Sequence, residues 1–390
     1  MSNQKKQNSV WTIILIVSIV FACASVAFMI SGMISKVAAE PEPTDPPAPT
    51  EPIQAEIMDT YDALVLDAVA EAYDAAKEVK KVYWIAEDAA VAPMPNPDCY
   101  GESDDPTSLQ WLLDEASELL DGQELLFHTG IEIAPLSNIT YYLDDSILVI
   151  TWQEIRENFV YTFSEVKVTH PSQFRRHLAN NEYDSDYSHP VSRMGNMVNA
   201  VMASSADFYR GRNHGIIVYQ GQVKRANYSE LVDTCFVDKN GNLILVPAGE
   251  LITVEEAQAF VDGHEIDFSL AFGPILVKDG VRCEPKNYYL GEVLGKYPRA
   301  ALCQMDELHY VVVVANSQHS YRTHPTIKKF ADQIETLGAQ SAYTLDGGQT
   351  GTIAMRGKAL NPLQSHERWI SDIIYWGTAI AYEEAENAES

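Results

Sequence analysis

The feature that most constrains this chain is an uncharged apolar segment near its amino terminus. Residues 10–34 contain no Asp, Glu, Lys or Arg and are rich in Ile, Val, Ala and Phe. As a helix, such a stretch is long enough to cross the hydrocarbon core of a bilayer, which is about 30 Å thick. Lys5 and Lys6 precede it, and positive charge favours the cytoplasmic side. We therefore expect a cytoplasmic tail over residues 1–9, a single-pass anchor, and the rest of the chain outside the cytoplasm, at the cell membrane.

A cleaved signal peptide is the alternative interpretation, with the small residues at 37–39 as its cleavage site. The apolar core of a secretory signal is only about 7 to 15 residues long, which favours the uncleaved anchor. Residues 35–56 follow as a linker, and 40–53 hold six prolines without a hydrophobic period. Chain of this composition is stiff and extended, so we expect it to act as a spacer.

The charge and cysteine content restrict the classes of partner. The chain has 27 Lys and Arg against 55 Asp and Glu, a formal net charge of −28. This balance argues against a nucleic-acid partner and against docking onto anionic lipid. Cys23 lies in the apolar segment, and none of the five cysteines has the spacing of a metal site. We expect the others to be buried thiols, and a disulfide between Cys235 and Cys283 stays open.

Hydrophobic periodicity predicts helices first and a β-rich domain afterwards. Helical spacing runs from residue 58 to about 83, and a second helix is expected between the cap at Asp105 and Gly122. These helices form a lead-in over residues 57–128. Further helices are expected at 171–178, 253–261 and 325–337, the second of them with a capping box.

Short β-rich runs dominate the remainder of the chain, and they fall at 140–143, 147–152, 160–163 and 166–168. Asn240-Gly241 between two apolar runs is a strong hairpin signal, because this pair accepts the positive φ of a tight turn. We predict an α+β fold with a mixed or antiparallel sheet and packed helices. One domain is expected over 129–384, followed by a tail at 385–390.

The segment that indicates chemistry is a strand that ends at Asp346 and continues into Gly347-Gly348. Glycine lets the backbone approach a ligand closely, and successive N–H groups in such a turn favour anions. A carboxylate beside this turn suits a phosphorylated substrate. The simpler alternative is a plain hairpin turn in which Asp346 bonds its own backbone.

Several other stretches also end an apolar run on polar groups, so we expect them to converge at one edge of the sheet. They are Ala206-Asp207-Phe208-Tyr209, Phe272-Gly-Pro-x-Leu-Val-x-Asp-Gly280, Pro298-Arg299-x-Ala301, Ala342-Tyr343-x-Leu345-Asp346-Gly347-Gly348 and Glu367-Arg368-x-Ile370-Ser371-Asp372. In this order the set resembles the phosphodiester glycosidase family, over about residues 160–380.

The resemblance implies a hydrolase that cleaves the glycosidic C1–O bond of a sugar-1-phosphodiester, in an envelope glycan or exopolysaccharide. Cleaving that bond passes through an oxocarbenium-like state, for which most glycosidases use two carboxylates. Asp346 and Asp207 are the expected catalytic residues, as base or nucleophile. The residues expected to bind substrate are Arg299, Arg322, Gly347, Gly348, Thr350 and Arg368. For Arg368 an ion pair with Glu367 is the alternative.

Three loops depart from the family pattern. Ser205-Ala206 stands where the family has Asn-Gly, Ala315-Asn316-Ser317 where it has Asp-Gly-Arg, and Gln349-Thr350 where it has Gly-Ser. A glycan-binding envelope protein without catalysis therefore remains an alternative. An aspartyl phosphatase is disfavoured, because Gly348 occupies the place of its second aspartate. No cofactor is required by the sequence, and a divalent cation stays open.

Overall fold

The computed structural model of the protein describes residues 81–130, 138–284, 293, 295–317, 324–363 and 365–383. The expected anchor, linker and terminal tail lie outside these residues. Within the described part of the chain, no helix is long and apolar enough to cross a membrane. All described elements belong to one compact unit that begins at Val79.

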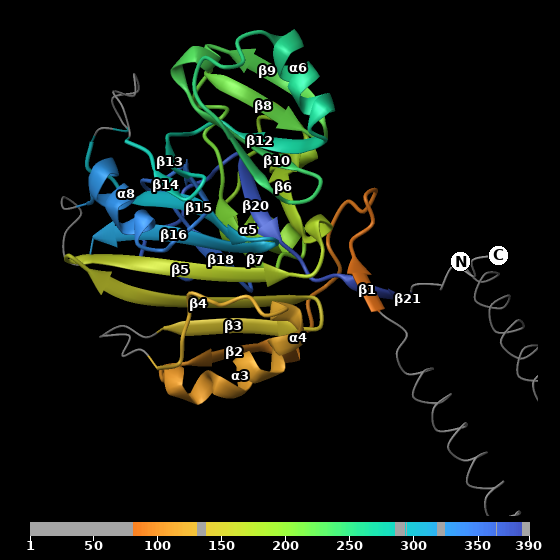
Figure 1. Ribbon diagram of the computed structural model, residues 1–390, viewed down its shortest axis with the longest axis vertical. Coiled ribbons are helices and arrows are strands. Elements are labelled where there is room, and N and C mark those ends of the chain that lie inside the picture. Colours follow the sequence, from red (N-terminus) through yellow and green to blue (C-terminus); the bar gives the residue numbers. More distant parts are fainter. Residues whose placement is uncertain are drawn as a thin grey trace, which may run out of the picture. The chain divides into compact units, whose positions relative to one another are not determined.

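A nine-stranded sheet lies at the centre of this unit (Figure 1). Both of its faces are covered, as the strand β16 shows: Val311 and Val313 belong to one core, and Val312 and Val314 to another. Successive side chains of a strand point to opposite faces, so this alternation requires a layer on each side. In spatial order the strands are β14 (Val281–Arg282), β13 (Ile275–Lys278), β17 (Ser341–Leu345), β15 (Arg299–Asp306), β16 (His309–Ser317), β5 (Phe159–Val168), β4 (Ile147–Arg156), β3 (Ile139–Asp144) and β2 (Tyr100–Ser103).

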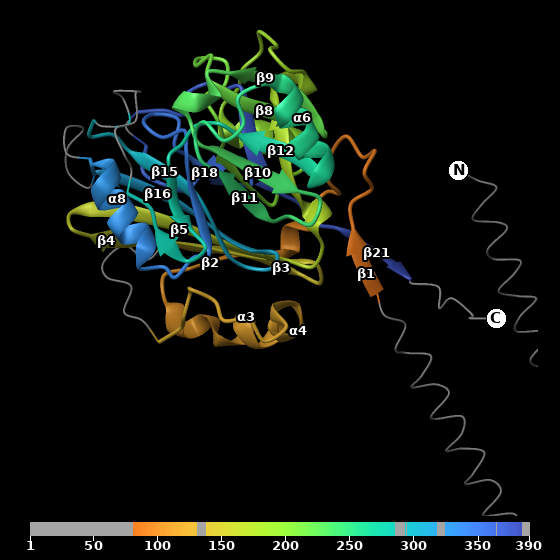
Figure 2. The same ribbon diagram turned by 45° about the horizontal axis from the view of Figure 1, so that its top comes forward.

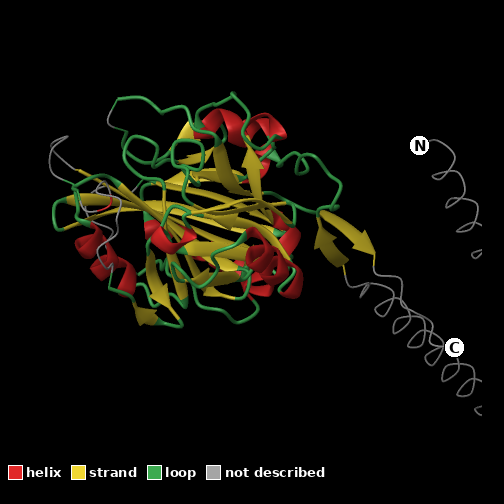
Figure 3. Ribbon diagram, turned by 90° about the horizontal axis from the view of Figure 1, so that it is seen from above, coloured by secondary structure: helices red, strands yellow, loops and turns green. Residues whose placement is uncertain are grey.

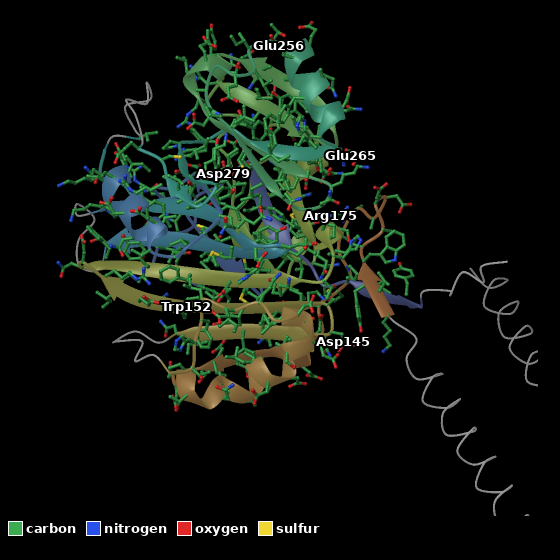
Figure 4. All side chains as sticks on the ribbon, viewed as in Figure 1. Asp145, Trp152, Arg175, Glu256, Glu265 and Asp279 are labelled. Atoms are coloured by element: carbon green, nitrogen blue, oxygen red, sulfur yellow. The ribbon has the colours of Figure 1, made fainter. Side chains whose placement is uncertain are left out.

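Helices cover one face of this sheet (Figure 2). They are α3 (Gln110–Glu115), α4 (Ser117–Leu120) and α8 (Ile327–Glu335). Leu112 of α3 and Phe330 of α8 share a core with Trp152 of β4, which is labelled in Figure 4. The expected cap at Asp105 is present, since its side chain accepts from the Thr107 N–H. The predicted second helix is thus confirmed, although it consists of the 3-10 turn η2 (Pro106–Leu109) and two short helices.

Two smaller sheets cover the other face. One contains β19 (Lys358–Ala359), β18 (Ile353–Met355), β7 (Met202–Ser205), β20 (Asp372–Trp376) and β6 (Phe174–Leu178); the other contains β11 (Leu243–Val246), β10 (Thr234–Asp238) and β12 (Ile266–Leu270). Phe174 joins the three sheets: its ring stacks on Trp376 at 4.5 Å and lies 5.3 Å from Phe268 and 4.9 Å from Tyr310. Strands dominate the described structure, and helices lie at its margins (Figure 3).

The remaining elements complete the unit. The helix α5 (Val191–Met197) packs on the five-stranded sheet, and α6 (Val254–Gly263) packs on β9 (Gln222–Asn227), the partner of β8 (Gly215–Tyr219). The strands β1 (Lys81–Trp84) and β21 (Ile380–Glu383) pair with each other. The capping box of α6 and the hairpin between β10 and β11 are both confirmed.

The sheet-rich fold with packed helices is confirmed, and every described strand pair is antiparallel. Two helix predictions were wrong in part. Residues 171–178 form the 3-10 turn η3 (Pro171–Gln173) and then β6, because pairing with β20 overrides the local helical pattern. Residues 81–83, expected to end a helix, belong to β1.

The position of Phe174 generates the first prediction. Phe174→Ala removes the ring that joins three sheets, and we expect it to lower the free energy of unfolding by about 3–5 kcal/mol. Urea unfolding followed by tryptophan fluorescence measures the change. Trp111→Ala is the control, because that ring is 49% exposed and its loss leaves no buried cavity. Equal losses for the two variants would contradict the assignment of Phe174 to the joint core.

Candidate active site

Two hydrogen bonds bring the ends of β7 and β17 together. The Asp346 N–H donates to the Ala206 carbonyl at 2.9 Å, and the Ser205 hydroxyl donates to the Asp346 carbonyl at 3.1 Å. Asp207 and Asp346 therefore follow the ends of two adjacent strands that belong to different sheets. Their charges are close enough for Asp207 to influence the ionisation of Asp346.

Asp346 is a buried carboxyl group with one unsatisfied oxygen. The residue is 9% exposed, and its Oδ2 atom has no hydrogen-bond partner among the described residues. Burial raises the pKa of Asp346 to about 7. The charge of Asp207 adds to this rise, whereas the Thr350 hydroxyl and the guanidinium groups of Arg368 and Arg212 oppose it. Asp346 can therefore exchange a proton near neutral pH, as a general acid or base requires.

The glycine turn after Asp346 packs tightly against the chain before β15. A Cβ atom on Gly347 would lie 2.4 Å from the Pro298 carbonyl oxygen, so only glycine fits there. Gly348 has φ +62°, and its N–H donates to the same carbonyl at 2.8 Å. The Thr350 N–H donates to the Gly347 carbonyl at 3.1 Å. The Gly348 N–H group is therefore already used by the Pro298 carbonyl and cannot also donate to a phosphate, contrary to the role expected for Gly348.

Arg299 is a buried cation without an acidic partner among the described residues. It is 4% exposed, and its guanidinium group donates to the Val293 and Gly295 carbonyls. Its Nε atom has no acceptor within the same part of the chain. Burial lowers the pKa of Arg299 to about 10, which leaves it protonated at neutral pH. A buried, uncompensated guanidinium group is costly, and a bound anion would relieve that cost.

Asp207 has a different environment from Asp346. Its carboxylate accepts hydrogen bonds from the Phe208 and Ala271 N–H groups, both at 2.7 Å, and lies 3.7 Å from Arg176. Arg176 donates through two nitrogen atoms to Asp372, at 2.9 and 2.6 Å. Burial raises the pKa of Asp372, whereas contact with Arg176 opposes the rise. The Asp207 carboxylate is thus fixed in place by donors, while that of Asp346 is left partly free.

A cavity of about 380 Å³ collects Asp346, Gly347, Gly348, Arg299 and Arg368 of the predicted residues. A neighbouring cavity of about 180 Å³ is lined by Asp207, Thr350 and again Arg368. Phe272, Tyr297 and Phe208 add aromatic rings to the lining of the first cavity. The predicted residue Arg322 lies outside the described residues. An acid, a cation and the glycine turn therefore line the same cavity.

Arg368 is exposed, and its guanidinium carbon lies 5.6 Å from the centre of the Phe208 ring. Glu367, its expected alternative partner, instead accepts from the Ser192 N–H at 2.9 Å. No ion pair joins Glu367 to Arg368 in the described part of the chain. The Arg368 charge is therefore directed to the two cavities that it lines.

Sequence reasoning missed two residues of the buried network, Arg176 and Asp372. Asp372 ends one of the motifs that carried the family resemblance, so that motif was a usable signal. Arg176 lies in a stretch predicted to be helical, and no local pattern indicated that it would reach two aspartates from other strands.

No group of three or more described His, Cys, Asp or Glu residues could hold a metal ion. The cysteines of the described chain are free thiols, Cys235 and Cys283 included.

A comparison with protein families agrees with this geometry. Residues 197–376 match the phosphodiester glycosidase family. The matched range contains Asp207, Arg299, Asp346 and Arg368, whereas Arg176 precedes it. The match confirms the resemblance and supports a glycosidase-type hydrolase at the level of the family.

Solved structures with a similar arrangement are distant in sequence. The catalytic domain of zebrafish N-acetylglucosamine-1-phosphodiester alpha-N-acetylglucosaminidase, auto-inhibited by its pro-peptide, is 14% identical, with a TM-score of 0.47 over 64% of this chain and 85% of that one. A hypothetical protein from Synechocystis is 13% identical, with a TM-score of 0.43 over 63% and 64%. A putative exported protein from Burkholderia pseudomallei is 12% identical, with a TM-score of 0.40 over 56% and 74%. No curated protein sequence matches the chain.

The buried network generates the second prediction. Arg176→Met leaves Asp207 and Asp372 without their shared cation, and we expect it to lower the free energy of unfolding by about 3–5 kcal/mol at pH 8. The loss should shrink towards pH 4, because burial raises the pKa of Asp372, and a protonated Asp372 no longer repels Asp207. Urea unfolding at the two pH values measures both effects.

Arg175→Met is the matched control for this change. Arg175 is the neighbour of Arg176 on β6, is labelled in Figure 4, and donates to the Ala89 carbonyl at 3.0 Å. A similar loss for both variants, independent of pH, would show that the network carries no special electrostatic role.

Proposed function

We propose that this protein is a membrane-anchored, extracytoplasmic hydrolase that cleaves the C1–O bond of a sugar-1-phosphodiester in an envelope glycan or exopolysaccharide. The observation that carries the proposal is the pairing, in one cavity, of a partly free buried carboxyl group, Asp346, with a buried cation that lacks an acidic partner among the described residues, Arg299. The family match of residues 197–376 supports the reaction class.

The chemistry assigns Asp346 and Arg299 complementary tasks. The phosphate of the substrate lies beside Arg299, which neutralises the charge that develops as the C1–O bond breaks. A phosphomonoester product has a second pKa of about 6, so it leaves without full protonation. Asp346 in its ionised form then attacks C1 or takes a proton from the attacking water. The aromatic rings around the cavity exclude bulk water and strengthen both interactions.

Asp207 contributes to this reaction by its charge. Its carboxylate is held by two backbone N–H groups and by Arg176, so it keeps a fixed position. A fixed negative charge near C1 would stabilise an oxocarbenium-like state and would keep the pKa of Asp346 high. In this scheme Asp346 exchanges the proton, and Asp207 supplies a carboxylate held in a fixed position.

The sequence outside the described residues supports the proposed location. The uncharged segment 10–34 is long enough to cross a bilayer, and the proline-rich linker would hold the catalytic domain away from it. A polymer of the cell envelope would then lie within reach of the cavity.

A second candidate function is a glycan-binding protein without catalysis. One observation favours it. Asn316 lies where the family has its Asp-Gly-Arg motif, and the Asn316 side chain donates to the Pro362 carbonyl at 2.7 Å. A side chain that the loop uses for its own structure is less available to substrate. The two candidates differ in a single measurable property, which is turnover.

The third prediction tests turnover. The full chain in detergent, incubated with a sugar-1-phosphodiester, should release reducing sugar. Asp346→Asn should lower kcat/KM by about a thousandfold or more, because it removes the carboxylate that acts as base or nucleophile. Asp262→Asn, on the exposed face of α6, is the matched control and should keep full activity. Glycan binding by the wild type without release from a broad substrate panel would support the second candidate instead.

The fourth prediction concerns pH. Because the pKa of Asp346 is raised to about 7 and the proposed mechanism needs its ionised form, activity should be lost as pH falls through about 7. We expect kcat/KM to decrease about tenfold per pH unit between pH 6.5 and 5. Initial rates in buffers of constant ionic strength give the profile. A rate independent of pH across this range would exclude Asp346 as the base or nucleophile.

A further inference from the structure

The second cavity shares a wall with the first. Phe208 and Arg368 line both cavities, so the two cavities are neighbours with these residues at their boundary. Arg368 lies over the Phe208 ring and is exposed, which lets its guanidinium group face either side. The proposed reaction uses the first cavity, and of the residues that line only the second it uses Asp207.

The second cavity has a cation of its own. Arg210 lines it and forms an ion pair with Asp186 at 3.0 Å. The Asp186 side chain is fully exposed, so water and salt screen this pair and it exchanges readily for another anion. Asp207 also lines the cavity, but its carboxylate is already held by the Phe208 and Ala271 N–H groups and by Arg176. The remaining charge in the cavity is therefore positive, from Arg210 and Arg368.

An aromatic ring stands at the same cavity. Trp369 lines the cavity and is 58% exposed, and its ring is in tilted contact with that of His189, with the ring centres 5.6 Å apart. A large exposed ring held in place offers an apolar face to a sugar ring and a polar edge to its hydroxyl groups. The Ser188 and Ser371 residues add hydroxyl-bearing side chains to the lining.

We propose that this cavity is a second subsite, which holds the next phosphate of a substrate with repeated sugar-phosphate units. Arg210 and Arg368 bind that phosphate, and Trp369 carries the adjoining sugar. The volume of about 180 Å³ corresponds to about six water molecules, which suits one phosphate with its linking atoms. This inference rests on the proposed function and makes its substrate a polyanionic chain with repeated phosphates.

Two synthetic compounds test the subsite. They share one sugar and one phosphodiester, and only the second compound carries a further phosphate on its aglycone. We expect the full chain to show a kcat/KM about tenfold higher for the bisphosphate at low salt. This preference should shrink as ionic strength rises. Arg210→Ala should bring the ratio of the two kcat/KM values close to one.

Arg156→Ala is the matched control for the loss of an arginine. Arg156 also forms an ion pair at the surface, at 2.8 Å with Glu154, and its side chain is 25% exposed against 28% for Arg210. It lines neither cavity. The control should keep the tenfold preference. A wild-type ratio near one, or the same ratio in both variants, would overturn the subsite.

A binding arm separates this inference from the proposed function. Calorimetric titration of Asp346→Asn with both compounds should show about tenfold tighter binding of the bisphosphate, and adding Arg210→Ala should remove the difference. If the wild type cleaves neither compound, the proposed function fails, and the binding ratio still decides the subsite. If it cleaves both at equal rates and binds them equally, the function stands and the subsite fails.

Discussion

The candidate active site depends on one junction, where hydrogen bonds join Asp346, the residue after β17, to Ser205 and Ala206 at the end of β7. Asp346 donates its N–H to Ala206, and Ser205 donates its hydroxyl to the Asp346 carbonyl. The two strands belong to different sheets, and this junction brings Asp207 and Asp346 close together. The Ser205 hydroxyl group takes part in the junction directly.

The aspartates of the site, Arg176 and Arg299 are all buried, but only some of them have partners of opposite charge. Arg176 satisfies Asp372 and part of Asp207, and backbone N–H groups satisfy the rest. Asp346 has no such partner for its Oδ2 atom, and Arg299 has no acidic partner, among the described residues. Burying such groups costs stability, and this cost is typical of groups that are arranged for a ligand. The Arg176–Asp372–Asp207 network is thus paired internally, whereas Asp346 and Arg299, which line the first cavity, keep polar atoms without partners among the described residues.

The sequence predicted much of the fold because local signals were strong. The Asn240-Gly241 hairpin and the capping box of α6 each follow from local chemistry. The helix prediction at 171–178 was wrong, because β6 pairs with β20, a strand almost two hundred positions later, and a local sequence pattern carries no information about that contact. For the site, motif order predicted that Asp346, Arg299 and Arg368 would meet. It did not reveal that Arg176 would hold Asp207, nor that Pro298 would occupy the Gly348 N–H, because both depend on tertiary packing.

The account stands on the claim that the cavity directs cleavage to the carbon side of the phosphodiester. Hydrolysis in water enriched in ¹⁸O, followed by mass spectrometry of both products, tests this directly. Attack at C1, with Asp346 as base or nucleophile and the phosphate as leaving group, places the label in the hydroxyl group at C1 of the released sugar. Label in the phosphate would mean that water attacks phosphorus, and it would contradict the account.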